Sequence, residues 1–375
     1  MSYQSRPLRI LLLGDTSNYH NALAAGLRSM GHDVTVASDG TMWMDTHRDI
    51  DLSRGSGKVG GLKLWAEMRW LRRRLFVGYD IVSICGTHFA KLRPERLRSI
   101  FDYVCRHNRR VYQTALATDS FYVEECHDPE SVLRYNEWVV DGKVTPYGES
   151  HSSIAYNWLH DPLLSYCKHV SSSVKGCVAA LYEYYVSAHR AMPSDRIAYG
   201  GIPIDVEAVR FDEPRRDDGK LRLFLGYPSA RMVEKGSERL LAAARQVERD
   251  YPDLCELQVV SDVKLTDFIA LMRQSDVILD QVYSYTPATT ALMAMAMGKT
   301  VLTGAEDDYY DFIGESTLRP AINVRPDDRE IYQAIEHIVL NRHEIVSRGH
   351  EGRLFVEKHN SSRVVAERFL DFWTR

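Results

Sequence analysis

The sequence predicts an α/β protein of two domains, each built on a parallel sheet with helices on both faces. Short apolar runs alternate with segments of helical periodicity along nearly the whole chain. This alternation begins twice, at residues 8–14 and again at residues 221–226. The length of 375 residues is also more than one typical core supports.

The first half begins with the apolar run 8–13, which ends at Gly14. The helix that follows has apolar residues at three-to-four spacing and stops at Gly31, and residues 32–37 form the next strand. Strand, helix and strand in this order make a βαβ unit, which implies parallel pairing. Further strands are expected at 81–85 and 110–115.

The second half repeats this order of elements. We expect strands at 221–226, 257–260, 277–280 and 300–303, and helices at 237–250, 266–274 and 289–297. The boundary between the halves is expected in the stretch 199–205, which contains Gly and Pro, and in the charged run 212–220 that follows it. A helix over 361–373 closes the chain.

Composition excludes several classes of protein. A hydrophobic content of 45% and a charged content of 26% are typical of a globular protein, and the net charge of -4 gives no reason to expect nucleic acid. The six cysteines form no CxxC pair, so we expect buried thiols and neither disulfides nor a metal site. No apolar run reaches the length of about 20 residues that a membrane helix needs, and we expect a cytoplasmic protein.

The stretch 276–301 is the most informative part of the chain. A strand leads into a polar loop, which contains Tyr285 and Thr286, and the loop leads into a helix that ends at Gly298. Such a loop lies at the carboxyl end of a strand and the amino end of a helix, where open parallel sheets bind their ligands.

The same stretch resembles the donor-binding element of retaining GT-B glycosyltransferases, the large group 1 family of bacterial polysaccharide and glycoconjugate biosynthesis. The residues 294–296 (Ala-Met-Ala) and Gly298 match that element, whereas Tyr285 and Met293 stand where the family has two glutamates. The chain is therefore similar to a divergent branch that lacks the paired glutamates.

The resemblance implies two Rossmann-like domains that face each other across a cleft. Residues 1–205 would bind the acceptor, 206–357 would bind a nucleotide sugar, and the helix in 358–375 would pack back on the N-terminal domain. The implied reaction moves a sugar from a nucleoside-diphosphate sugar to a glycan or lipid-linked acceptor, with retention. It implies neither a metal nor a cofactor besides this co-substrate.

Binding a diphosphate requires fixed positive charge and backbone N–H groups at a helix start. The family provides both through an arginine that is followed by a Lys-Gly pair. Arg231 with Lys235 and Gly236 match this pattern, although the spacing between Arg231 and Lys235 is one residue shorter than the usual one. The remaining donor-binding candidates lie in loops that follow strands. They are Gly14, Tyr285, Thr286, Thr289, Thr290 and Glu306.

The first domain offers two candidates for chemistry. The loop after Gly14 lacks GxGxxG, which argues against a dinucleotide enzyme. His20 in the next helix is a candidate cleft residue, because inverting GT-B enzymes place a catalytic histidine in a similar loop, and the alternative is a core histidine. Asp119, which follows the strand 110–115, is a candidate for contact with sugar or acceptor, and the alternative is a helix cap.

A basic amphipathic helix is expected over residues 63–76. Its apolar residues Leu64, Met68, Leu71 and Leu75 share one helical face, and its lysine and arginines lie mostly opposite. Such a helix can rest on an anionic membrane surface, which would make the protein peripheral at the inner membrane. The alternative is a core helix with a solvated basic face.

Two other functions remain open. The missing glutamates suggest a degenerate, non-catalytic sugar-binding relative. A sugar-nucleotide 2-epimerase has the same architecture, but it requires acid and base carboxylates, of which the sequence offers no convincing set.

Overall fold

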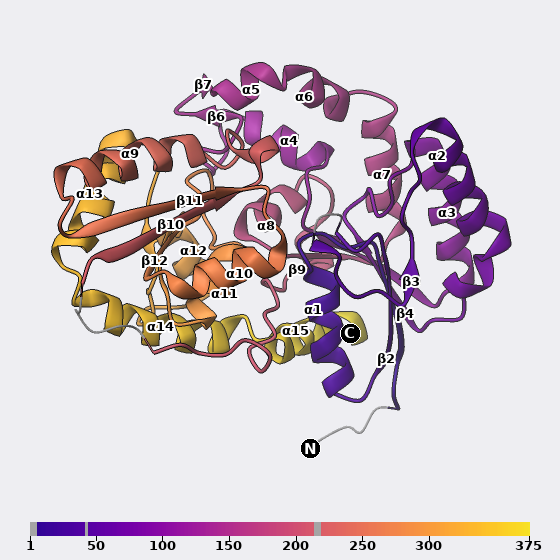
Figure 1. The fold of residues 1–375 in the computed structure, drawn as a ribbon. Helices are drawn as coiled ribbons and strands as arrows, with labels where there is room; N and C mark the ends of the chain where they lie inside the picture. The colour runs from indigo at the N-terminus through magenta and orange to yellow at the C-terminus, as the bar shows by residue number, and fades with distance from the viewer. Residues whose placement is uncertain (1–5, 42–43, 214–218) are drawn as a thin grey trace. The chain divides into compact units, whose positions relative to one another are not determined.

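The structure is a computed structural model that describes residues 6–41, 44–213 and 219–375 (Figure 1). It divides into two compact units. Unit 1 contains residues 6–125, 153–203 and 362–375, and unit 2 contains residues 126–152 and 204–361. The chain therefore passes between the units four times. Part of the charged run 212–220, where a boundary is expected, lies outside the described residues.

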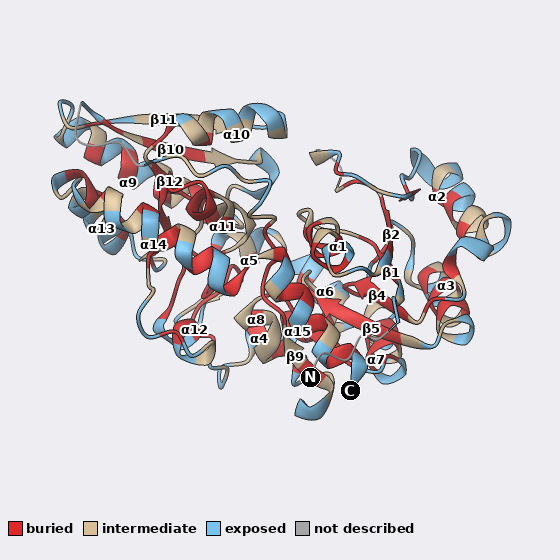
Figure 2. Cartoon of the chain, turned by 90° about the horizontal axis from the view of Figure 1, so that it is seen from below, coloured by how far each residue is buried: buried red, intermediate tan, exposed pale blue. Residues whose placement is uncertain are grey.

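Unit 1 is built on a seven-stranded parallel sheet with the order β3-β2-β1-β4-β5-β8-β9. Its strands are β1 (Arg9–Leu13), β2 (Asp33–Ser38), β3 (Ile50–Asp51), β4 (Ile81–Cys85), β5 (Arg110–Ala115), β8 (Cys177–Ala179) and β9 (Ile197–Tyr199). The central strands β1 and β4 are buried, because helices cover both faces of the sheet (Figures 1 and 2).

The helices of unit 1 include the C-terminal one. They are α1 (Tyr19–Ser29), α2 (Gly57–Ala66), α3 (Pro94–His107), α6 (Ser152–Leu159), α7 (Leu163–Ser173), α8 (Tyr182–Ala188) and α15 (Ser362–Thr374), and α4 (Ser120–His127) leads out of the unit. α15 packs on α1 so closely that a Cβ at Gly26 would lie 2.0 Å from the carbonyl oxygen of Ser362. The expected return of the last helix to the N-terminal part is confirmed.

Unit 2 has a five-stranded parallel sheet with the order β11-β10-β12-β13-β14. Its strands are β10 (Leu221–Tyr227), β11 (Cys255–Ser261), β12 (Val277–Leu279), β13 (Thr300–Thr303) and β14 (Ile322–Asn323). Its helices are α5 (Pro146–Ser150), α9 (Ser237–Asp250), α10 (Leu265–Gln274), α11 (Thr289–Ala296), α12 (Asp307–Phe312), α13 (Asp328–Leu340) and α14 (Glu344–His359). Two parallel α/β units confirm the predicted fold class.

Residues 126–152, which we call the inserted segment, belong to unit 2 although they interrupt the sequence of unit 1. The expected domain bounds place them in the first domain. The segment contains a short hairpin of β6 (Val139–Val140) and β7 (Lys143–Val144). Val140 packs against the core of unit 2, and Trp138 is buried.

The basic stretch differs from the expected single helix. α2 ends at Ala66, a π-helical turn covers Glu67–Leu71, and a 3-10 turn covers Arg73–Phe76. Leu64 and Met68 are buried as expected, but Leu71 and Leu75 are exposed. The π turn contains one more residue than an α turn, so it rotates Leu71 away from the face that an unbroken α-helix would give it.

Candidate functional site

The candidate site of unit 2 lies at one edge of its sheet. Because all five strands are parallel, the loops after β10, β12, β13 and β14 leave from the same edge. This edge carries the eight candidates of the second half, which are Arg231, Lys235, Gly236, Tyr285, Thr286, Thr289, Thr290 and Glu306.

Lys235 and Gly236 stand directly before α9. The Nζ of Lys235 lies 3.0 Å from Oδ1 of Asp280, which is buried at the end of β12. Gly236 has a φ of 67°, and a Cβ there would lie 2.3 Å from a methyl group of Val282. The backbone N–H of Val282 also donates to the carbonyl oxygen of Lys235 at 3.1 Å. The two loops are thus joined, and Lys235 is a partly buried cation beside one carboxylate.

Arg231 is an exposed cation near Lys235 in the sequence. Its guanidinium makes two hydrogen bonds to Glu234, at 2.6 and 2.9 Å. A bidentate pair of this kind fixes the guanidinium, but it also neutralises part of the charge that a phosphate would use.

Tyr285 is fully buried, and the inserted segment covers it. Its ring stacks on the ring of Tyr135 with 4.8 Å between centroids and 24° between planes. The backbone N–H of Arg134 donates to its phenol oxygen at 2.5 Å. Burial raises the pKa of Tyr285 to about 12, so the phenol stays protonated at neutral pH.

Glu306 is also buried, at the start of α12, and it holds five hydrogen bonds. Arg325 donates to both of its carboxylate oxygens at 2.8 Å. Asn323 donates at 2.7 Å, and Tyr135 and Arg134 each donate at 2.9 Å. Burial alone would raise the pKa of Glu306, but the hydrogen bonds from Arg325, Asn323 and Tyr135 outweigh it and lower the pKa below its ordinary value.

The three threonines differ in their surroundings. Thr286 is buried, whereas Thr289 and Thr290 are partly exposed at the first two positions of α11. The cap residue Ala288 has no side chain that could accept a hydrogen bond from the first turn. The start of α11 therefore offers backbone N–H groups and two hydroxyls on one helical turn.

In unit 1, Gly14 and His20 lie together at the end of β1. His20 is fully buried, with Nδ1 2.7 Å from the carbonyl oxygen of Gly14 and Nε2 3.2 Å from Oγ1 of Thr114. Burial lowers its pKa to about 4, so the ring is neutral at pH 7. Gly14 has a φ of 81°, and a Cβ there would lie 2.8 Å from the carbonyl oxygen of Phe89.

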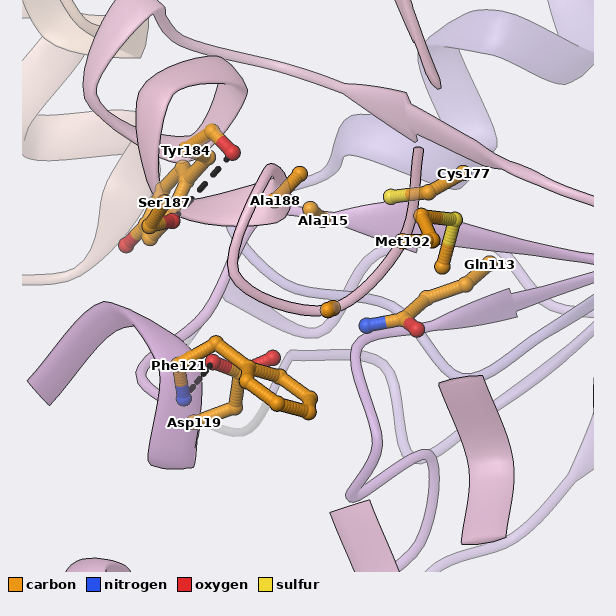
Figure 3. A pocket seen from close by; sticks show the side chains of 10 residues that line it. Gln113, Ala115, Asp119, Phe121, Cys177, Tyr184, Ser187, Ala188 and Met192 are labelled. Atoms are coloured by element: carbon orange, nitrogen blue, oxygen red, sulfur yellow. Dashed lines mark hydrogen bonds between the residues drawn. The ribbon is translucent and has the colours of Figure 1, made fainter. Parts of the chain in front are cut away.

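Asp119 is buried and caps α4. Its Oδ1 accepts hydrogen bonds from the backbone N–H groups of Phe121 at 3.0 Å and Tyr122 at 2.9 Å. It lines a small cavity with Gln113 (Figure 3). Burial raises the pKa of Asp119 to about 6. Gln113 and Thr114 are neighbours on β5 and point to opposite faces of the sheet. The cavity beside Asp119 is therefore on the face opposite to His20.

Several residues at these sites escaped the sequence analysis. The sequence pattern could have identified Asp280, because it is the first polar residue after an apolar strand. It could have identified Asp15 in the same way, since Asp15 follows the first strand and Gly14. Burial raises the pKa of Asp15 to about 7, although the backbone N–H of His20 donates to its carboxylate. No pattern marks Arg134 and Tyr135, because they lie in a stretch without periodicity.

Neither a metal centre nor a membrane span is found in the described ranges. Among residues 6–41, 44–213 and 219–375, no group of three or more His, Cys, Asp and Glu side chains is arranged to hold a metal ion. No helix in the same ranges is long and apolar enough to cross a membrane.

Comparison with known proteins supports the fold. Neither a protein-family model nor a curated protein sequence matches the chain. HepE from Anabaena, solved with UDP-glucose, is similar with a TM-score of 0.59 and 11% identity, over 98% of this chain and 99% of that one. A UDP-N-acetylglucosamine 2-epimerase is similar with a TM-score of 0.52 and 12% identity, over 98% and 97%.

TarM from Staphylococcus aureus, solved with UDP and α-GlcNAc-glycerol, is similar with a TM-score of 0.55 and 9% identity. The match covers 83% of this chain and 59% of TarM, so the chain spans about three fifths of the length of that protein. These structures have GT-B architecture, and the chain shares their fold: two Rossmann-like units with the last helix returned to the first.

Proposed function

We propose that the protein is an enzyme that acts on a nucleoside-diphosphate sugar, and specifically a glycosyltransferase with a glycan or lipid-linked acceptor. The observation that carries the proposal is the edge of unit 2, where Lys235 and the open first turn of α11 lie in loops that leave the sheet on the same side. HepE and TarM, which share the fold, were solved with UDP-glucose and UDP. In this proposal, unit 1 binds the acceptor.

Lys235 would bind the diphosphate. Asp280 already restrains its side chain, so little rotamer entropy is lost when a phosphate binds. The N–H groups at the start of α11 and the hydroxyls of Thr289 and Thr290 would bind further oxygens. As the bond between sugar and diphosphate breaks, negative charge grows on the leaving group, and a fixed cation stabilises that state more than the ground state.

Tyr285 and Glu306 have a different role in this proposal. Both are buried against Arg134 and Tyr135, so they hold the inserted segment on unit 2. We therefore assign direct donor contact to Lys235, Arg231, Thr289 and Thr290, and a positioning role to the two buried residues. Retention is inferred from the family resemblance of residues 294–298 alone.

His20 and Asp119 are also positioning residues in this proposal. Both ring nitrogens of His20 have partners within unit 1, and one oxygen of Asp119 caps α4. The buried, neutral ring of His20 is hydrogen-bonded to the carbonyl oxygen of Gly14, and this contact would fix the backbone of the loop that carries Asp15.

Two observations favour a second candidate, a non-catalytic relative that binds a nucleotide. The inserted segment covers Tyr285, which stands where the resembled family has a glutamate near the sugar. Arg231 is already paired with Glu234. A protein of this kind would bind a nucleoside diphosphate at Lys235 but leave its sugar bond intact.

A two-stage experiment separates these functions. A thermal-shift screen of UDP, GDP, ADP and CMP identifies the base, because a ligand that binds only the native state raises the melting temperature. The matching nucleotide sugars are then incubated with the protein and a mixture of glycan and lipid acceptors, and the products are analysed by mass spectrometry. A glycosylated acceptor supports the transferase, a changed sugar on an intact nucleotide supports the epimerase, and binding without any product supports the non-catalytic relative.

A further inference from the structure

The stretch 54–76 of unit 1 has an unusual concentration of charge. It contains seven lysine and arginine residues and one acidic residue, Glu67, so its net charge is +6 in a chain of net charge -4. The rest of the chain has 40 lysine and arginine residues against 50 acidic residues, a net charge of -10, so the charge of this short segment is opposite in sign to that of the rest.

The same stretch exposes apolar side chains. Five of the twelve large apolar residues that are exposed in the described parts of the chain lie between residues 59 and 75. Their exposed fractions are 79% for Val59, 48% for Leu62, 50% for Trp70, 78% for Leu71 and 41% for Leu75. Isolated exposed apolar residues are normal, but a cluster of them marks an interaction surface.

The π turn explains how these residues come to share a surface. Leu64 and Met68 lie on the face that packs into the core of unit 1. Val59 and Leu62 lie on the opposite face of α2, and the extra residue of the turn Glu67–Leu71 brings Trp70 and Leu71 round to that same face. Turns of this type are often found at functional sites.

Not all of the basic residues belong to this surface. Arg69 lies over the ring of Tyr103 at 5.3 Å, and Arg72 donates to the carbonyl oxygen of Asp51 at 3.3 Å, so both are used within unit 1. Lys58, Lys63, Arg73 and Arg74 are exposed and lie close to the apolar residues in the sequence, although Nζ of Lys63 is 3.9 Å from Oε1 of Glu67. We call the exposed residues together the basic-apolar ridge. They are Lys58, Val59, Leu62, Lys63, Trp70, Leu71, Arg73, Arg74 and Leu75.

We propose that the basic-apolar ridge docks unit 1 on the surface of an anionic lipid bilayer. Its apolar side chains match the boundary between headgroups and acyl chains, and a tryptophan is favoured at that depth. Its four exposed cations match the charge of anionic headgroups. Nucleic acid fits less well, because it offers a highly charged surface without an apolar layer for Leu71 and Val59.

The test is co-sedimentation of the protein with vesicles of phosphatidylcholine alone and with added phosphatidylglycerol. We expect binding to the anionic vesicles only, and release at high salt because surface attraction is screened. Changing Lys58, Lys63, Arg73 and Arg74 to Gln lowers the partition coefficient by at least about tenfold. The matched control changes four exposed cations of unit 2, Lys220, Arg245, Arg249 and Arg329, to Gln and leaves binding unchanged.

A second variant tests the apolar part. Leu62→Ser with Leu71→Ser leaves the charge intact, and both side chains are exposed, so the melting temperature stays the same while vesicle binding falls several-fold. Equal binding by this variant would reduce the ridge to charge attraction alone and overturn the docking proposal. No binding of the parent protein to anionic vesicles at low salt, or binding to RNA with no binding to lipid, would overturn it as well.

Discussion

The buried carboxylate of Glu306 connects the inserted segment with unit 2, and its removal provides a sharp test of the architecture of that unit. Glu306→Gln keeps the shape of the side chain but removes the charge that Arg325 and Arg134 share. A hydrogen bond to a charged group contributes about 1.5–3 kcal/mol, and a neutral one about 0.5–1.5 kcal/mol. Arg325 and Arg134 are about half exposed, which reduces their share by solvent screening.

We therefore expect Glu306→Gln to lower the free energy of unfolding of unit 2 by about 2–4 kcal/mol. The control is Asp308→Asn, because Asp308 also accepts from Arg134, at 3.0 Å, but is exposed, so its loss costs less than about 1 kcal/mol.

Hydrogen–deuterium exchange measured by peptide gives the local readout. In Glu306→Gln, peptides from residues 126–152 should exchange faster, whereas peptides from β1 and β4 in unit 1 should keep their rates. Unchanged exchange in 126–152, with stability within about 0.5 kcal/mol of the parent, would refute the view that Glu306 holds this segment.

Three further predictions concern the candidate sites. Lys235→Ala should weaken nucleotide binding by about 1.5–3 kcal/mol in calorimetry, whereas the control Lys220→Ala, at the opposite edge of the same sheet, should bind as the parent does. Equal affinities of the two variants for the nucleotide would remove Lys235 from the site. His20 has a pKa of about 4 when folded and a reference value of 6.5, so its contribution to the free energy of unfolding is present above pH 6.5 and is lost as the pH falls to 4. In urea unfolding, the parent should therefore lose up to about 3 kcal/mol over this range relative to His20→Gln, and parallel pH profiles of the two proteins would contradict the burial of a neutral ring. Gly236→Ala should cost about 1–3 kcal/mol of stability and reduce nucleotide binding, because alanine is strained at a φ of 67° and its Cβ would displace Val282. The control Gly142→Ala, which is also at positive φ but has open space around it, should cost stability without affecting binding.

Regular elements could be predicted wherever one local pattern decides the structure. The apolar runs at 81–85 and 110–115 are β4 and β5, and the amphipathic stretch 237–250 is α9, with bounds as expected. The sequence also placed Lys235 and Tyr285 in loops at strand ends, because a parallel sheet has only one edge for such loops.

What escaped prediction depends on contacts between distant residues. Arg134 bonds to Glu306 across 172 residues of sequence, and no local periodicity marks the segment that carries it. The burial of Tyr285 is likewise caused by Tyr135, 150 residues before it. The π turn at 67–71 was missed for another reason, since a helix of regular 3.6-residue period was assumed throughout.

The central claim is that the edge of unit 2 binds a nucleoside diphosphate through Lys235 and the start of α11. Hydrogen–deuterium exchange with and without the nucleotide selected by the thermal-shift screen tests it most directly. We predict slower exchange in peptides that cover residues 228–237 and 286–292, and loss of this protection in Lys235→Ala. Protection confined to other parts of the chain, or the same protection in Lys235→Ala, would contradict the proposed site.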